Sequence, residues 1–164
     1  MAGLDFDPIA EARRQWDAHG WGEVADGMAA LTAVMRAQQL LLARCDEVLA
    51  DFDLTFARYE LLALLSFTRH GELPLGKAGA RLQVHPASVT NAVNRLVEAG
   101  LVQKLPHPTD GRGTLASITA DGRVVAEAAT ARLNAEVFGA LGLSATEARQ
   151  LTALLAKVRA ASGD

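Results

Sequence analysis

The stretch ASVTNAVNRLVEAGLVQKLPHPTDGRGTLASIT, residues 87–119, decides the fold of this chain. In its first part Val89, Val93 and Leu96 recur at i, i+4 and i+7, which is the spacing of one apolar face of an α-helix. The period then changes, because LVQKLP and TLASIT alternate as β-strands do and PTDGRG between them has turn composition. The stretch therefore predicts a helix over residues 86–99 followed directly by a β-hairpin.

The opposite face of this predicted helix holds short hydrogen-bonding groups and one long cation: Ser88, Thr90, Asn91, Asn94 and Arg95. A duplex major groove accepts such a face, since Asn can bind adenine through two hydrogen bonds, Arg can bind guanine, and hydroxyls can contact phosphates or bases. An ordinary solvated helix face has the same residue types. The hairpin that follows favours the nucleic-acid interpretation.

The predicted hairpin carries a cation at its tip. Asp110 and Arg112 stand there beside Gly111 and Gly113, which permit a tight backbone. An arginine at this place suits the negative potential of a minor groove, and a nearby carboxylate would restrain it. The alternative is an exposed ion pair in a surface turn, worth about 0–1 kcal/mol. Two further residues of the hairpin complete the candidate DNA-binding set, Lys104 and His107.

The segments before this stretch predict two more helices. Thr55 is placed to cap a helix that runs to Gly71, and LGKAGARL forms a short helix joined to residues 86–99 by the turn QVHP. Pro86 suits a first helical position, whereas His85 is a poor cap before it. Helix, helix, turn, helix and hairpin is the order of a winged helix-turn-helix.

Further helices flank this domain on both sides. Asp7 and Pro8 open a short helix, and residues 23–49 predict a long helix whose apolar cover exceeds one face, which is typical of a dimer interface. After the hairpin, Thr119 caps one helix, and Ser144 with Glu147 forms a capping box for the last. The predicted fold is mainly α, an α+β winged helix-turn-helix with helical dimerisation arms from both termini and a two-stranded β wing. The predicted domains are 1–52 for N-terminal dimerisation and a ligand pocket, 53–119 for DNA binding, and 120–164 for C-terminal dimerisation.

The charge of the chain is unevenly distributed. The 164 residues have a formal net charge of -3, yet residues 75–123 carry 6 basic and 3 acidic side chains, against 6 and 12 in residues 1–74. A local basic surface is what phosphate binding needs, although chance clustering on a solvated face would look the same. The sequence shows neither an apolar secretory signal nor a stretch long enough to span a membrane, so we expect a cytoplasmic protein.

Motifs for metal binding and catalysis are missing from the sequence. The four histidines, at 19, 70, 85 and 107, lack the spacing of a zinc site, and there is no phosphate-binding glycine loop or nucleophile elbow. We therefore expect no metal, no cofactor and no enzyme. The single cysteine, Cys45, is interpreted as a core residue, with a redox-sensing regulator as the alternative.

Over roughly residues 30–160 the chain resembles the MarR (multiple antibiotic resistance regulator) family of transcription factors. The resemblance is densest in LTFARYELLALL and in HGELPLGKAGARLQVHPASVTNAVNRLVEAGLVQKLPHPTDGRGTLASITADGR. It implies a homodimer that binds double-stranded DNA through a recognition helix at 86–99 and a wing with the element Asp110-Gly111-Arg112. It also implies a repressor that leaves a pseudo-palindromic operator when a small molecule binds. Many members have basic residues where Asn91 and Gly111 stand, so we expect a weaker grip on phosphates.

The opening helix resembles that of the urate-responsive branch of this family. Trp16 matches a helix tryptophan of that branch, while Glu60 and Lys104 stand where an aspartate and an arginine are expected. The resemblance implies a small aromatic or anionic effector near these three residues, although a further arginine is missing, its place falling at Asn91 or Ala92. Trp16 could equally be a large apolar group that pins the added helix to the domain. The competing functional class is a winged-helix scaffold for protein contacts that does not bind DNA.

Overall fold

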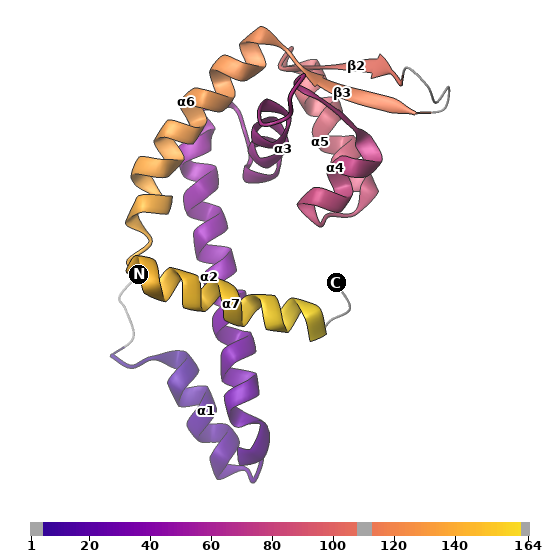
Figure 1. The fold of residues 1–164 in the computed structure, drawn as a ribbon. Coiled ribbons are helices and arrows are strands. Elements are labelled where there is room, and N and C mark those ends of the chain that lie inside the picture. The colour runs from indigo at the N-terminus through magenta and orange to yellow at the C-terminus, as the bar shows by residue number, and fades with distance from the viewer. Residues whose placement is uncertain (1–4, 108–112, 162–164) are drawn as a thin grey trace. The chain divides into compact units, whose positions relative to one another are not determined.

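The computed structural model describes residues 5–107 and 113–161 of the chain. The residues group into two compact units, Met1–Glu47 and Val48–Asp164, coloured from indigo to yellow along the chain in Figure 1. Within the described residues, no helix combines the length and apolar character that crossing a membrane requires.

The first unit is a helical hairpin. It consists of α1, Pro8–Ala18, and most of α2, Gly22–Leu49. The predicted start of α1 is confirmed, because the Asp7 carboxylate accepts a hydrogen bond from the backbone N–H of Ile9 at 2.9 Å and Pro8 follows it. Gly20, with a φ of 83°, makes the turn between the two helices.

Side chains of α1 and α2 join the two arms of this hairpin. The guanidinium of Arg13 contacts Asp17 of its own helix and Asp26 of α2. Trp16 lies edge-on against Trp21, with the ring centroids 5.4 Å apart. Edge-to-face aromatic pairs add about 0.5–1.5 kcal/mol beyond the area they bury, so this contact fastens α1 to the start of α2. Trp16 thus has a structural role, which is to hold α1 against Trp21.

Large apolar side chains remain exposed along α2. They spread over several turns of the helix: Val24, Leu31, Val34, Met35, Leu40, Leu41 and Leu42. A solvated helix normally hides its apolar stripe and exposes polar residues. This part of the helix therefore has the composition of a surface that another protein surface covers.

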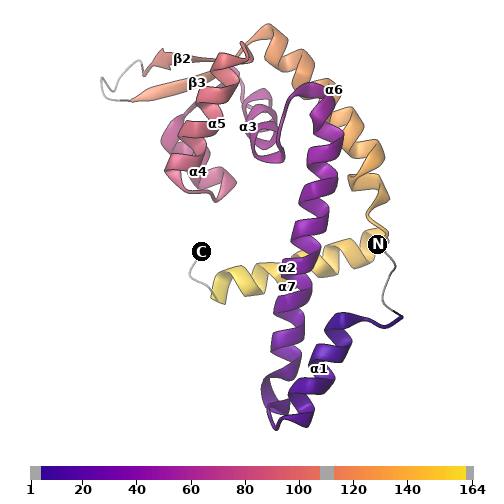
Figure 2. The same cartoon turned by 180° about the vertical axis from the view of Figure 1, so that it is seen from behind.

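The second unit contains the helix-turn-helix and the wing (Figures 1 and 2). Its elements are η1 (Ala50–Phe52), α3 (Phe56–Ser66), β1 (Glu72–Pro74), α4 (Leu75–Leu82), α5 (Pro86–Glu98), β2 (Val102–Pro106), β3 (Thr114–Ile118), α6 (Ala120–Glu136), η2 (Phe138–Ala140) and α7 (Ala145–Ala161). This order confirms the predicted winged helix-turn-helix. The helix α3 is shorter than predicted, since it ends at Ser66 before the Gly71 turn.

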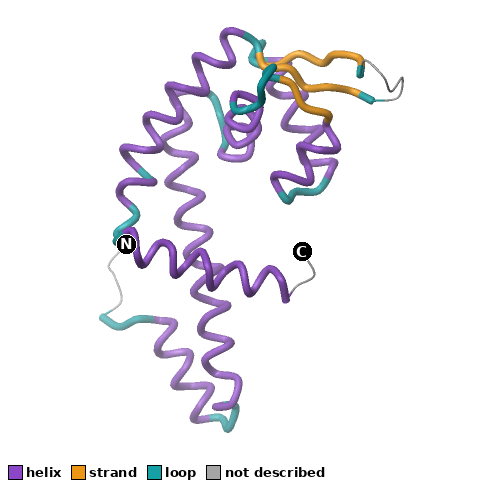
Figure 3. Tube along the Cα trace, in the orientation of Figure 1, coloured by secondary structure: helices purple, strands orange, loops and turns teal. Residues whose placement is uncertain are grey.

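The sheet has three strands, one more than the sequence predicted. Its order is β1-β3-β2 with antiparallel pairs, and the three strands lie side by side in Figure 3. The sequence analysis missed β1, which is only three residues long and pairs Leu73 with Ala116 of β3. Leu73 and Ala116 are both buried, so β1 holds the base of the wing against the core.

The core of the second unit lies between α3, α5, α6 and the sheet. Its most deeply buried large side chains include Leu61, Leu62, Leu65, Val93, Leu96, Val102 and Leu133. The predicted apolar face of residues 86–99 is confirmed, because Val89 is 3% exposed, Val93 0% and Leu96 1%. Tyr59 of α3 also bonds to Thr130 of α6 through their hydroxyl groups, 3.0 Å apart.

Helix starts in this unit follow the predicted capping residues with two exceptions. Thr119 accepts from the N–H of Gly122 at 2.9 Å, and the capping box between Ser144 and Glu147 is formed. The prediction that His85 is a poor cap is wrong, because its Nδ1 accepts from the N–H of Ala87 at 3.2 Å. The hydroxyl of Thr55 precedes α3 as predicted but makes no capping hydrogen bond.

Candidate nucleic-acid interface

The outward face of α5 is polar and exposed to solvent. All five residues that the sequence analysis assigned to this face, Ser88, Thr90, Asn91, Asn94 and Arg95, are exposed. The helix presents this face because Val89, Val93 and Leu96 anchor its other side in the core. A 13-residue helix fixed in this way can enter a groove as a rigid unit.

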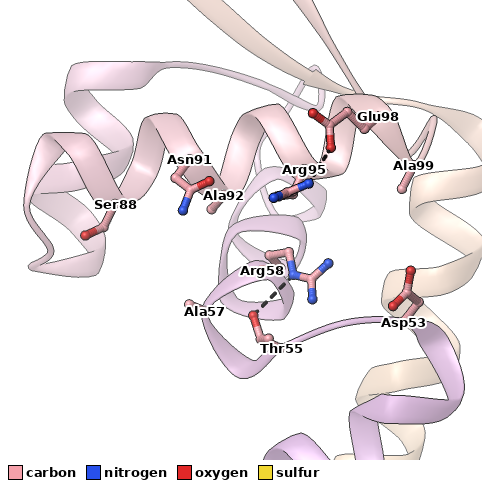
Figure 4. Close-up of a pocket in the computed structure, with 10 residues that line it drawn as sticks. All are labelled: Asp53, Thr55, Ala57, Arg58, Ser88, Asn91, Ala92, Arg95, Glu98 and Ala99. Carbon is pink, nitrogen blue, oxygen red and sulfur yellow. Dashed lines mark hydrogen bonds and ion pairs between the residues drawn. The ribbon is translucent and has the colours of Figure 1, made fainter.

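One edge of this face borders a groove formed with the start of α3 (Figure 4). The groove has a volume of about 700 Å³, and Ser88, Asn91 and Arg95 line it on the α5 side. Thr55 and Arg58 line it on the α3 side, where the Arg58 Nε donates to the Thr55 hydroxyl at 3.3 Å. The sequence analysis missed Arg58. Its position in the first turn of α3 was visible, but only the packing of α3 against α5 brings it to the recognition face.

The charges around this groove are mixed. Arg95 forms an ion pair with Glu98 one turn later in α5, with 3.0 Å between the guanidinium and the carboxylate. The side chains are 63% and 64% exposed, so this pair adds little to stability and is easily broken. Asp53 places another carboxylate at the groove. Arg95 must therefore leave or share Glu98 to contact a phosphate, which fits the expected weaker grip on phosphates.

The other edge of the face is joined to the wing. Lys104, exposed on β2, donates from Nζ to the Oδ1 of Asn94 across a distance of 2.6 Å. This hydrogen bond connects α5 to the hairpin through two residues that were separate candidates in the sequence. Thr90 bonds instead within its own helix, where its hydroxyl donates to the carbonyl of Pro86 at 3.1 Å.

The base of the wing is closed by a backbone hydrogen bond. The N–H of His107 donates to the carbonyl of Gly113 at 3.0 Å, just beyond the paired strands β2 and β3. His107 itself is half-buried. The predicted tip residues Asp110 and Arg112 lie outside the described residues.

The three residues predicted to bind an effector lie on different elements. Trp16 belongs to α1, Glu60 to α3 and Lys104 to β2. Glu60 is half-buried, and burial raises the pKa of its carboxyl group above the usual value. It lines a cavity of about 40 Å³ between α3 and α5, which has room for about one water molecule and not for an aromatic ligand.

Cys45 is 6% exposed, in agreement with its interpretation as a core residue. A buried thiol is poorly accessible to a peroxide. In residues 5–107 and 113–161, no three or more His, Cys, Asp or Glu side chains gather in a way that could hold a metal ion.

Comparison with known proteins gives the same family from sequence and from structure. The sequence model of the MarR family matches residues 52–113. Among solved structures, the chain is similar to Sco5413, a MarR family transcriptional regulator from Streptomyces coelicolor, with 53% identity and a TM-score of 0.76. That match covers 85% of this chain and 96% of Sco5413.

A structure of a DNA complex is also similar. A mutant MarR from E. coli, complexed with operator DNA, shares 25% identity and a TM-score of 0.73 with this chain, over 82% of this chain and 96% of that one. A curated relative, the HTH-type transcriptional regulator Mb0904 of Mycobacterium bovis, is 34% identical over 70 residues. Those residues are 43% of this chain, and they span about half the length of that relative, 49%.

Proposed function

Because this chain belongs to the MarR family of transcriptional regulators, we propose that it binds duplex DNA and controls transcription. The observation that carries the proposal is the exposed polar face of α5, fixed by a buried apolar face and bordered by the β2–β3 wing. Asn and Arg side chains on a helix of this kind can reach base edges and phosphates in a major groove. The DNA-bound MarR structure with a similar fold supports this mode of binding.

In the proposed complex, the protein is a homodimer on a pseudo-palindromic site. Two copies of α5 would enter successive major grooves about 34–36 Å apart, which is one helical turn of DNA. Arg112 would reach the flanking minor groove, where negative potential favours a cation. The exposed apolar residues of α2, together with Leu151, Leu154 and Val158 of α7, supply the surface that a second copy would cover.

We propose further that the protein is a repressor that a small molecule releases from its operator. A small aromatic or anionic effector is the candidate, with the exposed Lys104 as its contact. The Lys104–Asn94 hydrogen bond supports a link between effector and DNA, because a ligand that engages the Lys104 ammonium would withdraw it from the recognition helix. A ligand screen that monitors both tryptophan fluorescence and DNA affinity tests this, and a panel that changes neither would contradict it.

The experiment for DNA binding is a fluorescence-anisotropy titration of purified protein. The duplexes are the upstream region of the protein's own gene and a scrambled version, at about 50 and 200 mM salt. We expect selective binding that weakens steeply with salt. Asn91→Ala should lose about tenfold in discrimination, whereas Asn134→Ala, the same change at an exposed position of α6, should bind as the wild type does. Arg112→Ala should weaken both duplexes alike.

A folded dimer that binds neither duplex at low salt would overturn this proposal. The remaining alternative would then be a winged-helix scaffold for protein contacts. A Cys45-based redox-sensing regulator has less support, because Cys45 is buried. Peroxide-induced loss of DNA binding that disappears in Cys45→Ser would restore it.

A further inference from the structure

The hydrogen bond between Lys104 and Asn94 fixes how the Asn94 side chain is oriented. The Lys104 ammonium carries only donors, so the atom that faces it at 2.6 Å must be the acceptor oxygen of the amide and not its NH₂ group. The Asn94 NH₂ group therefore points away from Lys104. Both side chains are exposed, so the free groups of the pair are available to a ligand in front of α5 and the wing.

An asparagine held in this way keeps both donors of its NH₂ group free, while its acceptor oxygen already has one hydrogen bond from a cation. Reading adenine takes both functions of the amide, because Oδ1 accepts from adenine N6 while the NH₂ group donates to N7. Here one lone pair of the oxygen accepts from the Lys104 ammonium, and the positive charge of that ammonium disfavours the approach of a second N–H donor to the other lone pair. The remaining NH₂ group and the remaining N–H groups of Lys104 match a base edge with two acceptors, which is guanine O6 and N7.

We infer that Lys104 sets the base preference of Asn94, turning a residue type that commonly reads adenine into a donor-only contact that selects guanine. Lys104 acts here as a positioning residue, through its effect on Asn94. The inference rests on the proposed DNA-binding function and deepens it.

Asn91 provides a control within the same helix. It lies one turn before Asn94 and is exposed, and its side chain makes no hydrogen bond with any of the described residues. Its amide can therefore turn freely and retains both its donor and its acceptor for adenine. The two asparagines of α5 are thus expected to read different bases, although the residue type is the same.

The first measurement uses free protein. The side-chain carbonyl and NH₂ resonances of Asn94 and Asn91 are assigned by NMR with the help of Asn94→Ala and Asn91→Ala. Lys104→Met, which keeps an unbranched apolar stem and loses the ammonium, should move the Asn94 resonances and leave those of Asn91 in place. Unchanged Asn94 resonances would show that the bond is absent in solution and would overturn the inference.

The second measurement is the base preference, obtained by selection from a pool of randomised duplexes. The base that Asn94 contacts is identified as the position of the duplex at which Asn94→Ala loses its base preference. In the wild type, this position should favour guanine over adenine about tenfold. Lys104→Met should shift that position toward adenine, whereas Lys104→Arg, which keeps a donor-only cation, should preserve guanine. The double variant with Asn94→Ala should show no shift, and Lys157→Met, an exposed charge removed from α7, should leave every preference unchanged.

The two proposals fail in different ways. A wild-type protein that selects no duplex overturns the DNA-binding function, and this inference with it. Selective binding by the wild type, with the same base preferred in Lys104→Met, overturns the inference alone. A uniform loss of affinity in Lys104→Met without a changed preference would make Lys104 a simple phosphate contact.

Discussion

Gly122, in the first turn of α6, is required by the fold because a methyl group there would overlap the carbonyl oxygen of Leu101. Gly76 in α4 is the opposite case, since nothing lies within 4 Å of the place where its methyl group would be. Outside such constraints, alanine is the better helix residue by about 1 kcal/mol. The same substitution at these two glycines is therefore expected to have opposite effects.

We expect Gly122→Ala to lower the free energy of unfolding by about 1–3 kcal/mol, because backbone must move to relieve the overlap. Gly76→Ala should raise it by up to about 1 kcal/mol. Urea unfolding at one fixed protein concentration measures both, since the stability of a dimer depends on concentration. Similar midpoints for the two variants would contradict the close approach of α6 to Leu101.

Glu60 makes stability depend on pH. Burial raises the pKa of its carboxyl group in the folded protein above the unfolded value of about 4.5. Burying the ionised carboxyl group therefore lowers the free energy of unfolding. This loss of stability is absent below about pH 4.5, where the group is protonated in both states, and fully present above the folded pKa. Glu60→Gln removes this loss.

The free energy of unfolding of Glu60→Gln should therefore exceed that of the wild type at pH 7, and the difference should shrink toward pH 4. Thermal or urea unfolding across this pH range measures the difference. Glu127→Gln, an exposed position of α6, serves as the matched control and should show a small difference that stays flat. A Glu60→Gln difference independent of pH would mean that the carboxyl group is fully solvated.

Among the elements, α5 depends on an N-cap that its sequence does not suggest. His85 accepts from the N–H of Ala87, a role that Asn, Asp and Ser usually fill. We expect His85→Ala to lower the free energy of unfolding by about 0.5–2 kcal/mol, whereas His85→Asn should restore the cap. Urea unfolding distinguishes them, and equal losses in both variants would assign His85 a role other than capping.

The elements also show what the sequence could predict. The starts of α1, α6 and α7 were predicted correctly because a capping residue and the helix it caps are neighbours in the chain. The strand β1 was missed because it has three residues and gains its identity from pairing with β3, more than 40 positions later. The groove beside Arg58 and the Lys104–Asn94 bond could not be predicted either, because each joins residues of elements that only the fold brings together.

For the whole molecule, the exposed apolar residues of α2 and α7 predict a dimer. Leu154 of α7 is 59% exposed and Val124 of α6 is 65% exposed. Leu154→Glu would place a carboxylate in the covered surface, where burying an unpaired charge is costly. We expect the dissociation constant of the dimer to rise at least about tenfold, which corresponds to about 1.4 kcal/mol.

Sedimentation equilibrium measures this effect, because the wild type should have twice the chain mass of 17.3 kDa. Val124→Glu, an equal change at an exposed position of α6 that is not among the residues of the proposed α2 and α7 surface, should remain dimeric. A wild-type protein that sediments at the chain mass at all concentrations would contradict the assembly, and an unchanged Leu154→Glu would place the interface elsewhere.

The hydrogen bond from the His107 N–H to the Gly113 carbonyl also marks where the paired part of the wing ends. Among the described residues, the hairpin is held to its domain on the near side of this bond, by the pairing of β2 with β3 and of β3 with β1 and by the Lys104–Asn94 hydrogen bond. We therefore expect the fold to tolerate substitutions beyond this bond, because these contacts stay in place. A library of such substitutions would vary the strength of the proposed DNA binding without a redesign of the core.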